Sequence, residues 1–210
     1  MTALITIGPT QEPLDAMRLL TNRSTGELGT CLAVALAKKG HRVIALRGTG
    51  CTASKLPLAQ NGVTVAPFTT TEDLDHEILR VSRHEQVDIV FHAAAVADFY
   101  LPGGGDGKLP SAQEITLTFF PTPKLLSSMR GRFPNARIIG WKFAAGGDHT
   151  SALSSATTQL KSCNSDACVL NGPSYGRGFG FMEKTGGFHH FEDREKLCAF
   201  LAGDLPLLDL

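Results

Sequence analysis

The sequence predicts an α/β protein: a Rossmann-like, mainly parallel sheet with helices on both faces and a flap or hairpin extension. Short apolar runs end in glycine-rich or small-residue loops, and helical patterns follow them along most of the 210 residues. With 42% apolar and 19% charged residues, the chain is long enough for one covered core and too short for two comfortable domains. We therefore expect residues 1–210 to form a single domain, with its ligands at the carboxyl ends of the strands.

The first half alternates between strands and helices. Residues 3–7 are an apolar run ended by Gly8. Residues 25–40 have helical spacing, lysines in the last turn and a glycine at the C-cap. Further elements are predicted as strands at 41–46 and 61–67 and as an amphipathic helix at 71–86, which has acids in its first turn.

The second half continues the same alternation around a loop. The predicted elements are a strand over 87–98 that opens into a small-residue turn, a mobile loop at 100–111, a hairpin or edge strand at 114–120, a strand at 137–143, a helix at 151–163, a strand at 167–170, a hairpin at 180–191 and a helix at 193–201. The flap is expected at about 99–125.

Charge and cysteine content restrict the classes of partner. Twenty basic and twenty acidic residues cancel, so nothing global attracts nucleic acid or an anionic membrane. The N-terminal run lacks the features of a signal peptide, and no stretch reaches the length of a membrane span. Five cysteines without a CxxC pair indicate reduced thiols. We expect a cytoplasmic protein without nucleic-acid or membrane partners.

The loop after the first strand, GPTQEPLD, stands where a doubly wound fold binds phosphates. It matches neither GxGxxG nor GxxxxGK[ST], which disfavours an ordinary dinucleotide fingerprint and an ordinary P-loop. Ligand contact and simple turn formation both remain open for this loop on the pattern alone.

The segment NRSTG precedes a helix, so Ser24 or Thr25 is expected to be its N-cap. Capping requires neither the amide of Asn22 nor the guanidinium of Arg23. Both groups are good partners for a phosphate or a developing oxyanion.

Two further segments are candidates for ligand contact. AAAVAD, which ends at Asp98, has small side chains that let a ring or sugar approach the backbone, although tight helix packing has the same signature. Lys108 lies in a glycine-rich loop, where a cation would neutralise phosphate charge if the loop folds over a nucleotide. A solvated lysine is the ordinary alternative.

Together these motifs resemble one family, the phosphopantothenoylcysteine synthetase domain, which in many bacteria is the C-terminal half of a bifunctional flavoprotein of coenzyme A synthesis. The similarity runs through GPTQEPLD, NRSTGELG, AAAVADF, GKLPS, FPTPKLL and IIGWKFA to the strand that ends at Asn171. NRSTG and AAAVAD, about seventy residues apart, are specific as a pair. No flavoprotein half is seen, so a stand-alone ligase domain is expected.

The resemblance implies a reaction in two steps. The carboxylate of 4′-phosphopantothenate attacks the α-phosphate of CTP or ATP, with Mg²⁺ accompanying the triphosphate, and the amine of cysteine then displaces the nucleotide. Asn22 would hold the acyl nucleotide and assist aminolysis, and Lys108 would neutralise the triphosphate. The family is typically dimeric, so the resemblance also implies a homodimer.

The resemblance also implies binding roles. Those for the nucleotide fall on Gly8, Ser24, Gly26, Ala93, Ala94, Ala95, Asp98, Thr122, Pro123, Lys124, Leu125 and Trp141. Substrate-binding roles are expected for Arg23, Lys161 and Asn171, and no residue is expected to be a metal ligand.

The sequence departs from the family pattern in places, and two other readings stay open. FAAGG stands where the family usually has an acidic residue, and Thr122 replaces an asparagine of the base-binding segment. One alternative is a Rossmann-like NAD(P)-dependent reductase, for which Arg47 would suit a 2′-phosphate. The other is a non-catalytic nucleotide-binding homologue that kept the fold and lost turnover.

Overall fold

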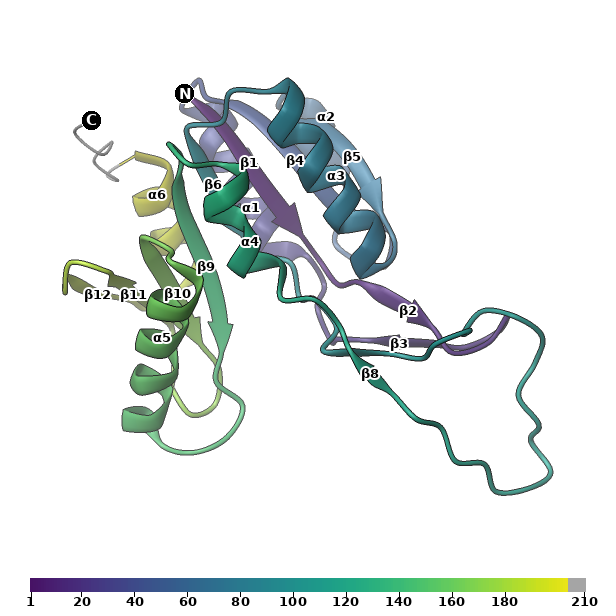
Figure 1. Ribbon diagram of the computed structural model, residues 1–210. Coiled ribbons are helices and arrows are strands. Elements are labelled where there is room, and N and C mark those ends of the chain that lie inside the picture. Colours follow the sequence, from purple (N-terminus) through teal and green to yellow (C-terminus); the bar gives the residue numbers. More distant parts are fainter. Residues whose placement is uncertain (204–210) are drawn as a thin grey trace.

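The computed structural model describes residues 1–203 and has an eight-stranded sheet with the order β12-β11-β10-β9-β6-β1-β4-β5 (Figure 1). Six strands are parallel: β1 (Thr2–Ile7), β4 (Arg42–Gly48), β5 (Thr64–Phe68), β6 (Ile89–His92), β9 (Arg137–Phe143) and β10 (Ala167–Asn171). In chain order these strands lie 3-2-1-4-5-6, which is the Rossmann arrangement. An antiparallel hairpin, β11 (Phe179–Glu183) and β12 (Phe188–Phe191), extends the edge beside β10.

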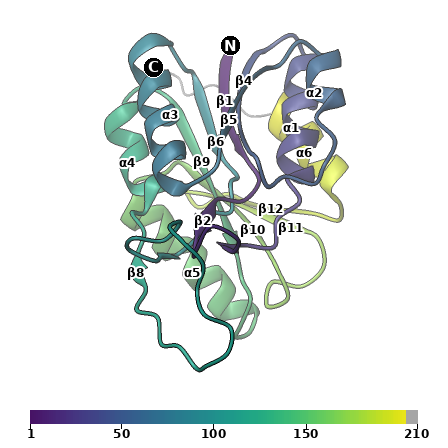
Figure 2. The same cartoon turned by 90° about the vertical axis from the view of Figure 1, so that its right-hand side faces the viewer.

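Helices cover both faces of this sheet, as the sequence predicts (Figure 2). One face carries α1 (Glu27–Lys38), α2 (Leu56–Gln60) and α6 (Arg194–Gly203). The other carries α3 (Thr71–His84), α4 (Leu125–Arg132) and α5 (His149–Cys163). The two faces come from the period-2 geometry of the strands: in β1, Ile5 packs into the core under α1 and α6, and Leu4 packs into the core under α3 and α4.

The ends of α1 show which capping expectations hold. Gly40 has φ +82, and the N–H of His41 bonds Leu36 O at 3.1 Å, so the glycine ends the helix as predicted. The expected N-cap at Ser24 or Thr25 is wrong, because Gly26, with φ +79, is the N-cap and makes no side-chain capping bond. Glycine suits this position because the chain turns there through a left-handed conformation.

The flap is a long loop on two short ladders (Figure 1). β2 (Gln11–Pro13) pairs with β3 (Leu19–Thr21), and β7 (Phe99–Tyr100) pairs with β8 (Phe120–Pro121). The strand predicted at 114–120 is wrong except for its last residue, since residues 111–119 have no partner strand. Alternation of apolar and polar residues cannot make a strand where no neighbouring backbone is available to pair.

The membrane and thiol expectations can be compared with the described residues. None of the helices in residues 1–203 is long and apolar enough to cross a membrane. All five cysteines are free, which agrees with the prediction of unpaired thiols.

His92 is the last residue of β6 and is buried against β1. Its Nδ1 lies 3.0 Å from Thr6 Oγ1, and the same hydroxyl accepts the N–H of Ala94 at 3.0 Å. Burial disfavours the imidazolium and lowers the pKa of His92 from its ordinary 6.5 to about 4. The residue is therefore neutral in the folded protein at physiological pH.

This buried histidine predicts a loss of stability in mild acid. Because the folded-state pKa lies below the unfolded value, the unfolded chain binds an extra proton between pH 6.5 and about 4, so stability falls as pH falls through that window. The contribution is on the order of 2–3 kcal/mol. Urea unfolding at several pH values should show a flatter pH dependence for His92→Gln than for the wild type. The exposed control His76→Gln should keep the wild-type slope, and equal slopes in all three proteins would contradict the assignment.

Candidate active site at the switch point of the sheet

The loops that follow β1 and β6 meet where the strand order reverses. Gly8 accepts the N–H of Ala95 at 2.9 Å, and the N–H of Thr10 bonds Ala95 O at 3.3 Å. These bonds continue the parallel pairing beyond the strands as a bridge between Pro9 and Ala95. The predicted phosphate loop and the predicted small-residue turn are therefore adjacent, at the place where open α/β sheets bind ligands.

Asn22 joins the two most specific motifs of the sequence. It follows β3, and its Nδ2 donates to Val96 O at 2.9 Å and to Ala95 O at 3.3 Å. The carbonyl of Asn22 accepts the N–H of Ser24 at 2.9 Å, which turns the chain toward α1. The structure thus brings NRSTG and AAAVAD into direct contact, with Asn22 exposed at their junction.

The Cys51 side chain packs against Gly8 of the candidate phosphate loop and against Gly26, the N-cap of α1. A Cβ on Gly8 would lie 1.9 Å from Cys51 Sγ, and one on Gly26 would lie 2.7 Å from it. Burial raises the pKa of the Cys51 thiol, so the thiol stays protonated and fills space. The loop after β4 is held beside α1, because Ala53 N bonds Thr25 O at 3.0 Å.

A buried polar cluster supports the same loops. Glu12 accepts the N–H and the hydroxyl of Thr71 at 2.8 and 2.6 Å, and Thr10 Oγ1 accepts the N–H of Ala97 at 2.9 Å. The polar side chains of Thr10, Glu12 and Thr71 are all buried. Sequence reasoning did not single out this cluster, since its members are ordinary turn or helix-start residues until the fold brings them together.

Lys108 lies on the flap and is exposed. The segment around it is bonded to the β2–β3 turn: Ala16 N donates to Gly107 O at 2.9 Å, and Leu109 N donates to Asp15 Oδ2 at 3.0 Å. Since β3 leads from this turn directly to Asn22, the two predicted catalytic residues are attached to opposite ends of one short ladder. At about 3.3 Å per residue, the ladder separates them by roughly 13 Å along the backbone.

The segment predicted to bind the base lies beside the small-residue turn. Thr122 N bonds Asp98 O at 3.0 Å, its hydroxyl bonds Ala97 O, and Lys124 forms an exposed ion pair with Asp98. Pro123 lies exposed between them. Leu125 begins α4, and its side chain is buried in the core under α3 and α4. Only its backbone is therefore near the edge of the sheet.

Trp141 and Asn171 lie near the carboxyl ends of β9 and β10. The Trp141 ring meets Phe91 edge to face, with 6.4 Å between centroids, and packs with the core under α1 and α6. Its Nε1 is buried and has no hydrogen-bond partner among the described residues. Asn171 ends β10 opposite Phe143.

Arg23, predicted to bind substrate, follows Asn22 in the chain and its side chain is exposed.

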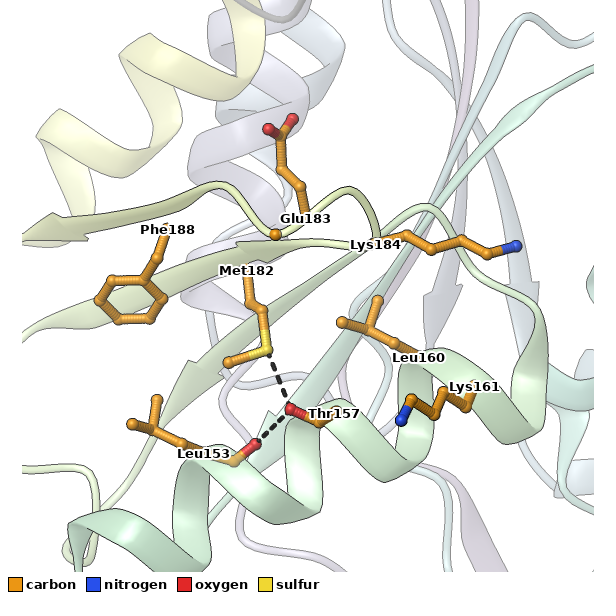
Figure 3. A pocket seen from close by; sticks show the side chains of 9 residues that line it. Leu153, Thr157, Leu160, Lys161, Met182, Glu183, Lys184 and Phe188 are labelled. Carbon is orange, nitrogen blue, oxygen red and sulfur yellow. Dashed lines mark hydrogen bonds between the residues drawn. The ribbon is translucent and has the colours of Figure 1, made fainter.

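Lys161 is the predicted site residue that the structure does not bring to the others. It lies in the last turn of α5, which runs opposite to the strands and so ends at their amino edge. There it borders a groove of about 410 Å³ with Met182, Glu183 and Lys184 (Figure 3). Glu183 pairs with Ala167, the first residue of β10, which confirms that the groove lies at the edge opposite the switch point.

A metal site built from side chains alone is not seen in residues 1–203. No group of three or more His, Cys, Asp or Glu side chains there is placed to hold an ion. Mg²⁺ usually keeps several waters and binds substrate phosphates with few protein ligands, so the donors that fit it here would be phosphate oxygens.

Strand order and site together define the class: a Rossmann-like α/β protein whose candidate ligand-binding loops meet at the switch point. The chain belongs to the family described as the DNA/pantothenate metabolism flavoprotein C-terminal domain, whose model matches residues 1–199. Among curated proteins it is similar to the coenzyme A biosynthesis bifunctional protein CoaBC of Thermococcus kodakarensis, at 31% identity over 169 residues, and of Bacillus subtilis, at 32% over 179 residues.

The matches cover 80% and 84% of this chain but only 40% and 42% of those two proteins. The chain thus spans about two fifths of the length of these relatives. Among solved structures, the DNA/pantothenate metabolism flavoprotein from Streptococcus pneumoniae has a TM-score of 0.82 at 21% identity, covering 97% of both chains. A Cab2 mutant in complex with phosphopantothenate-cysteine has a TM-score of 0.78 at 17% identity, covering 97% of this chain and 85% of that one. At these identities the likeness concerns the fold.

The contact between Gly8 and Cys51 predicts a steric coupling. Gly8→Ala should lower the free energy of unfolding by about 2–4 kcal/mol, because it adds left-handed strain at φ +83 to a clash with Sγ. Cys51→Ala in the same chain should recover at least about 1 kcal/mol, since the clash is removed and the strain stays. Chemical denaturation of the single and double variants measures this coupling. Gly62→Ala, with φ +69 and open space around it, is the control and should not couple to Cys51; additive effects of Gly8→Ala and Cys51→Ala would contradict the packing.

Proposed function

We propose that this chain is a phosphopantothenate–cysteine ligase of coenzyme A biosynthesis. It would activate the carboxylate of 4′-phosphopantothenate with CTP or ATP, in the presence of Mg²⁺, and join it to the amine of cysteine. Family membership supports this assignment, as do the names of the CoaBC relatives and the phosphopantothenate-cysteine complex of a protein with the same fold.

The observation that carries the proposal is the pair of bonds from Asn22 to Ala95 and Val96. These bonds fix a polar amide at the switch point, beside a wall of small residues and a loop whose Gly8 has φ +83. A fixed amide is suited to orient an acyl nucleotide, because orientation and charge stabilisation supply most of the rate in such transfers.

The chemistry divides into two displacements. In the first, a carboxylate oxygen attacks the α-phosphorus, an acyl–phosphate bond forms and pyrophosphate leaves; Lys108 would offset the charge of the triphosphate. In the second, the amine nitrogen attacks the acyl carbon, an amide forms, the nucleoside monophosphate leaves, and the amine loses a proton. Asn22 would hold the acyl nucleotide for this step.

The choice of nucleotide and the location belong to the same proposal. The Thr122 hydroxyl donates to Ala97 O and is not free to bind a base. Backbone groups of this segment and residues beside it would therefore recognise the base. Trp141 is half-buried near the end of β9, so it would meet a base with its ring and not with its buried Nε1. We place the reaction in the cytoplasm, where five free thiols would stay reduced.

The reductase alternative loses its candidate phosphate ligand. Arg47 donates through Nη2 to Ala53 O at 2.5 Å and to Cys51 O at 3.4 Å, so its guanidinium is used to hold the loop after β4. A 2′-phosphate would have to compete with those bonds. The non-catalytic alternative is supported by FAAGG, because this segment has no acidic residue and Asp148, which follows it in the sequence, is the N-cap of α5 and accepts the N–H of Ser151.

The proposal is tested by pyrophosphate release with 4′-phosphopantothenate, cysteine and either CTP or ATP. The wild type should release pyrophosphate only when acid and nucleotide are both present. Lys108→Ala should slow this release by about 100-fold or more, as expected when a cation that offsets charge in the transition state is removed. Asn22→Ala should lose most amide formation while the acyl nucleotide still forms.

Two control variants separate these effects from general damage. Lys196→Ala removes an exposed lysine of α6, and Asn61→Ala removes an amide that donates to Pro57 O at 2.8 Å. Both should keep wild-type rates. Absence of pyrophosphate with either nucleotide, despite nucleotide binding, would favour the non-catalytic homologue, and binding of NADPH in preference to CTP and ATP would favour the reductase.

We also propose a homodimer joined through the flap. Phe99, Tyr100, Ile115, Phe119 and Phe120 are exposed apolar side chains on this extension. Exposed apolar side chains that gather on one segment mark interaction sites, whereas singly scattered ones are normal for a protein surface. The flap of one copy would then cover such side chains on the other.

Sedimentation should give twice the 22.4 kDa chain mass at micromolar concentration. The double variant Ile115→Asp/Phe119→Asp should shift it to the monomer mass, since two buried carboxylates would oppose association. Phe188→Asp, at an equally exposed site on β12, should leave the dimer intact. A monomeric wild type would contradict the homodimer.

A further inference from the structure

Asp15 stands at the turn between β2 and β3, and its two oxygens have different partners. Oδ1 accepts the N–H groups of Met17 and Arg18 at 2.8 and 2.7 Å, which closes the turn. Oδ2 accepts the N–H of Leu109 at 3.0 Å, across the gap to the flap, and lies 3.2 Å from Arg18 Nη1. The side chain is only 1% exposed. A buried carboxylate is thus shared between a local turn and a segment more than ninety residues away.

Lys108 lies between the two bonds that attach the flap to this turn. On one side Gly107 O accepts the N–H of Ala16 at 2.9 Å, and on the other Leu109 N donates to Asp15. The flap also packs closely against β2, since a Cβ on Gly104 would lie 2.1 Å from Pro13 O. The backbone on both sides of an otherwise exposed lysine is therefore fixed.

The turn is itself attached to the body of the protein. Glu12 of β2 accepts the N–H and the hydroxyl of Thr71 in the first turn of α3, and both of these side chains are buried. β3 pairs with β2 and continues into Asn22, which bonds the turn after β6. The Lys108 segment is thus connected to α3 and to the sheet through the short ladder of β2 and β3.

We infer that Asp15 is a positioning residue that holds the Lys108 segment at a fixed place relative to Asn22 and the switch point, an inference that rests on the proposed ligase function. A lysine on a free loop would sample many positions, and misplacement of a charged group by about 1 Å can cost a factor of about 100 in rate. The bond to Leu109 fixes the backbone amide adjacent to Lys108 and so limits these positions. Ionic hydrogen bonds to a carboxylate are stronger than neutral ones, which suits this task.

The charges around Asp15 are consistent with an ionised group. The N–H of Leu109, the N–H groups of Met17 and Arg18 and the Arg18 guanidinium together hold the pKa of Asp15 below its usual value, against the opposing effect of burial. Asp15 is therefore an acceptor on both oxygens at neutral pH. Both the turn and the flap contact need it in that state.

Because the two Asp15 oxygens have different partners, one substitution can remove the contact with the flap and keep the β2–β3 turn. Asp15→Asn keeps one oxygen, which can still accept from Met17 and Arg18, and places an NH₂ group opposite the N–H of Leu109. Two donors cannot bond, so the flap contact is lost while the turn is kept. Asp148→Asn is the matched control, because Asp148 accepts the Ser151 N–H at 2.8 Å at the start of α5, which lies away from the flap (Figure 1).

Amide hydrogen exchange and pyrophosphate release test the inference together. In Asp15→Asn the Leu109 amide should exchange at least ten-fold faster, with the Met17 and Arg18 amides changed much less. Pyrophosphate release should fall by about 10- to 100-fold in kcat, with the KM for cysteine unchanged. In a Lys108→Ala background the same substitution should change the rate by less than about two-fold, because Asp15 acts through Lys108. Asp148→Asn should leave all of these quantities at wild-type values.

Other results would overturn the inference and identify which part fails. Unchanged exchange at Leu109 would show that the contact does not hold the flap. An equal fall in rate with and without Lys108 would show a structural role alone. A wild-type chain that releases no pyrophosphate would reject the proposed function, and with it the catalytic meaning of this contact, while the exchange data would still report whether Asp15 fixes the segment.

Discussion

The hydrogen bond from Ala95 N to Gly8 O holds together the two loops on which the candidate site is built. It extends the pairing of β1 and β6 beyond the sheet at the point where the strand order reverses. Glycine suits this position because its φ is +83 and because Cys51 Sγ occupies the space that a side chain would need. Asn22 then bonds the same turn from the other side, so the amide depends on this pairing for its position.

From this junction two polar connections extend outward. One runs through Thr10 and Glu12 into the first turn of α3, where buried side-chain oxygens accept backbone N–H groups and the Thr71 hydroxyl. The other runs along β2 and β3 to Asp15 and the flap. Each connection consists of directed bonds between side chains and backbone, which define relative position more closely than apolar contact does. Lys108, although exposed, is thereby tied to the sheet.

The two edges of the sheet differ in what they offer. At the carboxyl edge, glycine turns, small side chains and a helix N-terminus leave backbone groups accessible. At the amino edge, Lys161 borders a groove that is lined by apolar and by polar or charged side chains in equal number, from α5 and from the β11–β12 hairpin (Figure 3). Because α5 runs opposite to β10, a lysine in its last turn cannot be close to the switch point. Lys161 is therefore separated from the predicted site residues at the carboxyl edge.

Much of the fold could be predicted from the sequence, because the buried parallel strands are continuous apolar runs and the helices have clear periodicity and caps. The strand at 137–143 has the predicted bounds, and the glycine that ends α1 was identified by its position. The short elements α2, α4, β2 and β3 have too few residues for a periodic pattern. The N-cap at Gly26 depends on a left-handed backbone turn and makes no side-chain capping bond, so residue type did not predict it. The prediction of a strand at 114–120 was wrong because alternating apolar and polar residues form a strand only where a neighbouring strand is available for pairing.

For the site, the sequence by itself determined which residue types are present: the polar motif at Asn22, the small-residue turn that ends at Asp98 and the lysine of the flap. Only the tertiary structure decided which of them meet, because contacts such as Asn22 to Val96, Cys51 beneath Gly8 and Asp15 to Leu109 join residues far apart in the chain. Hydrogen bonds and close packing act over a few ångströms, whereas sequence patterns record only local periodicity and spacing. The contacts of single residues therefore became visible only in the fold.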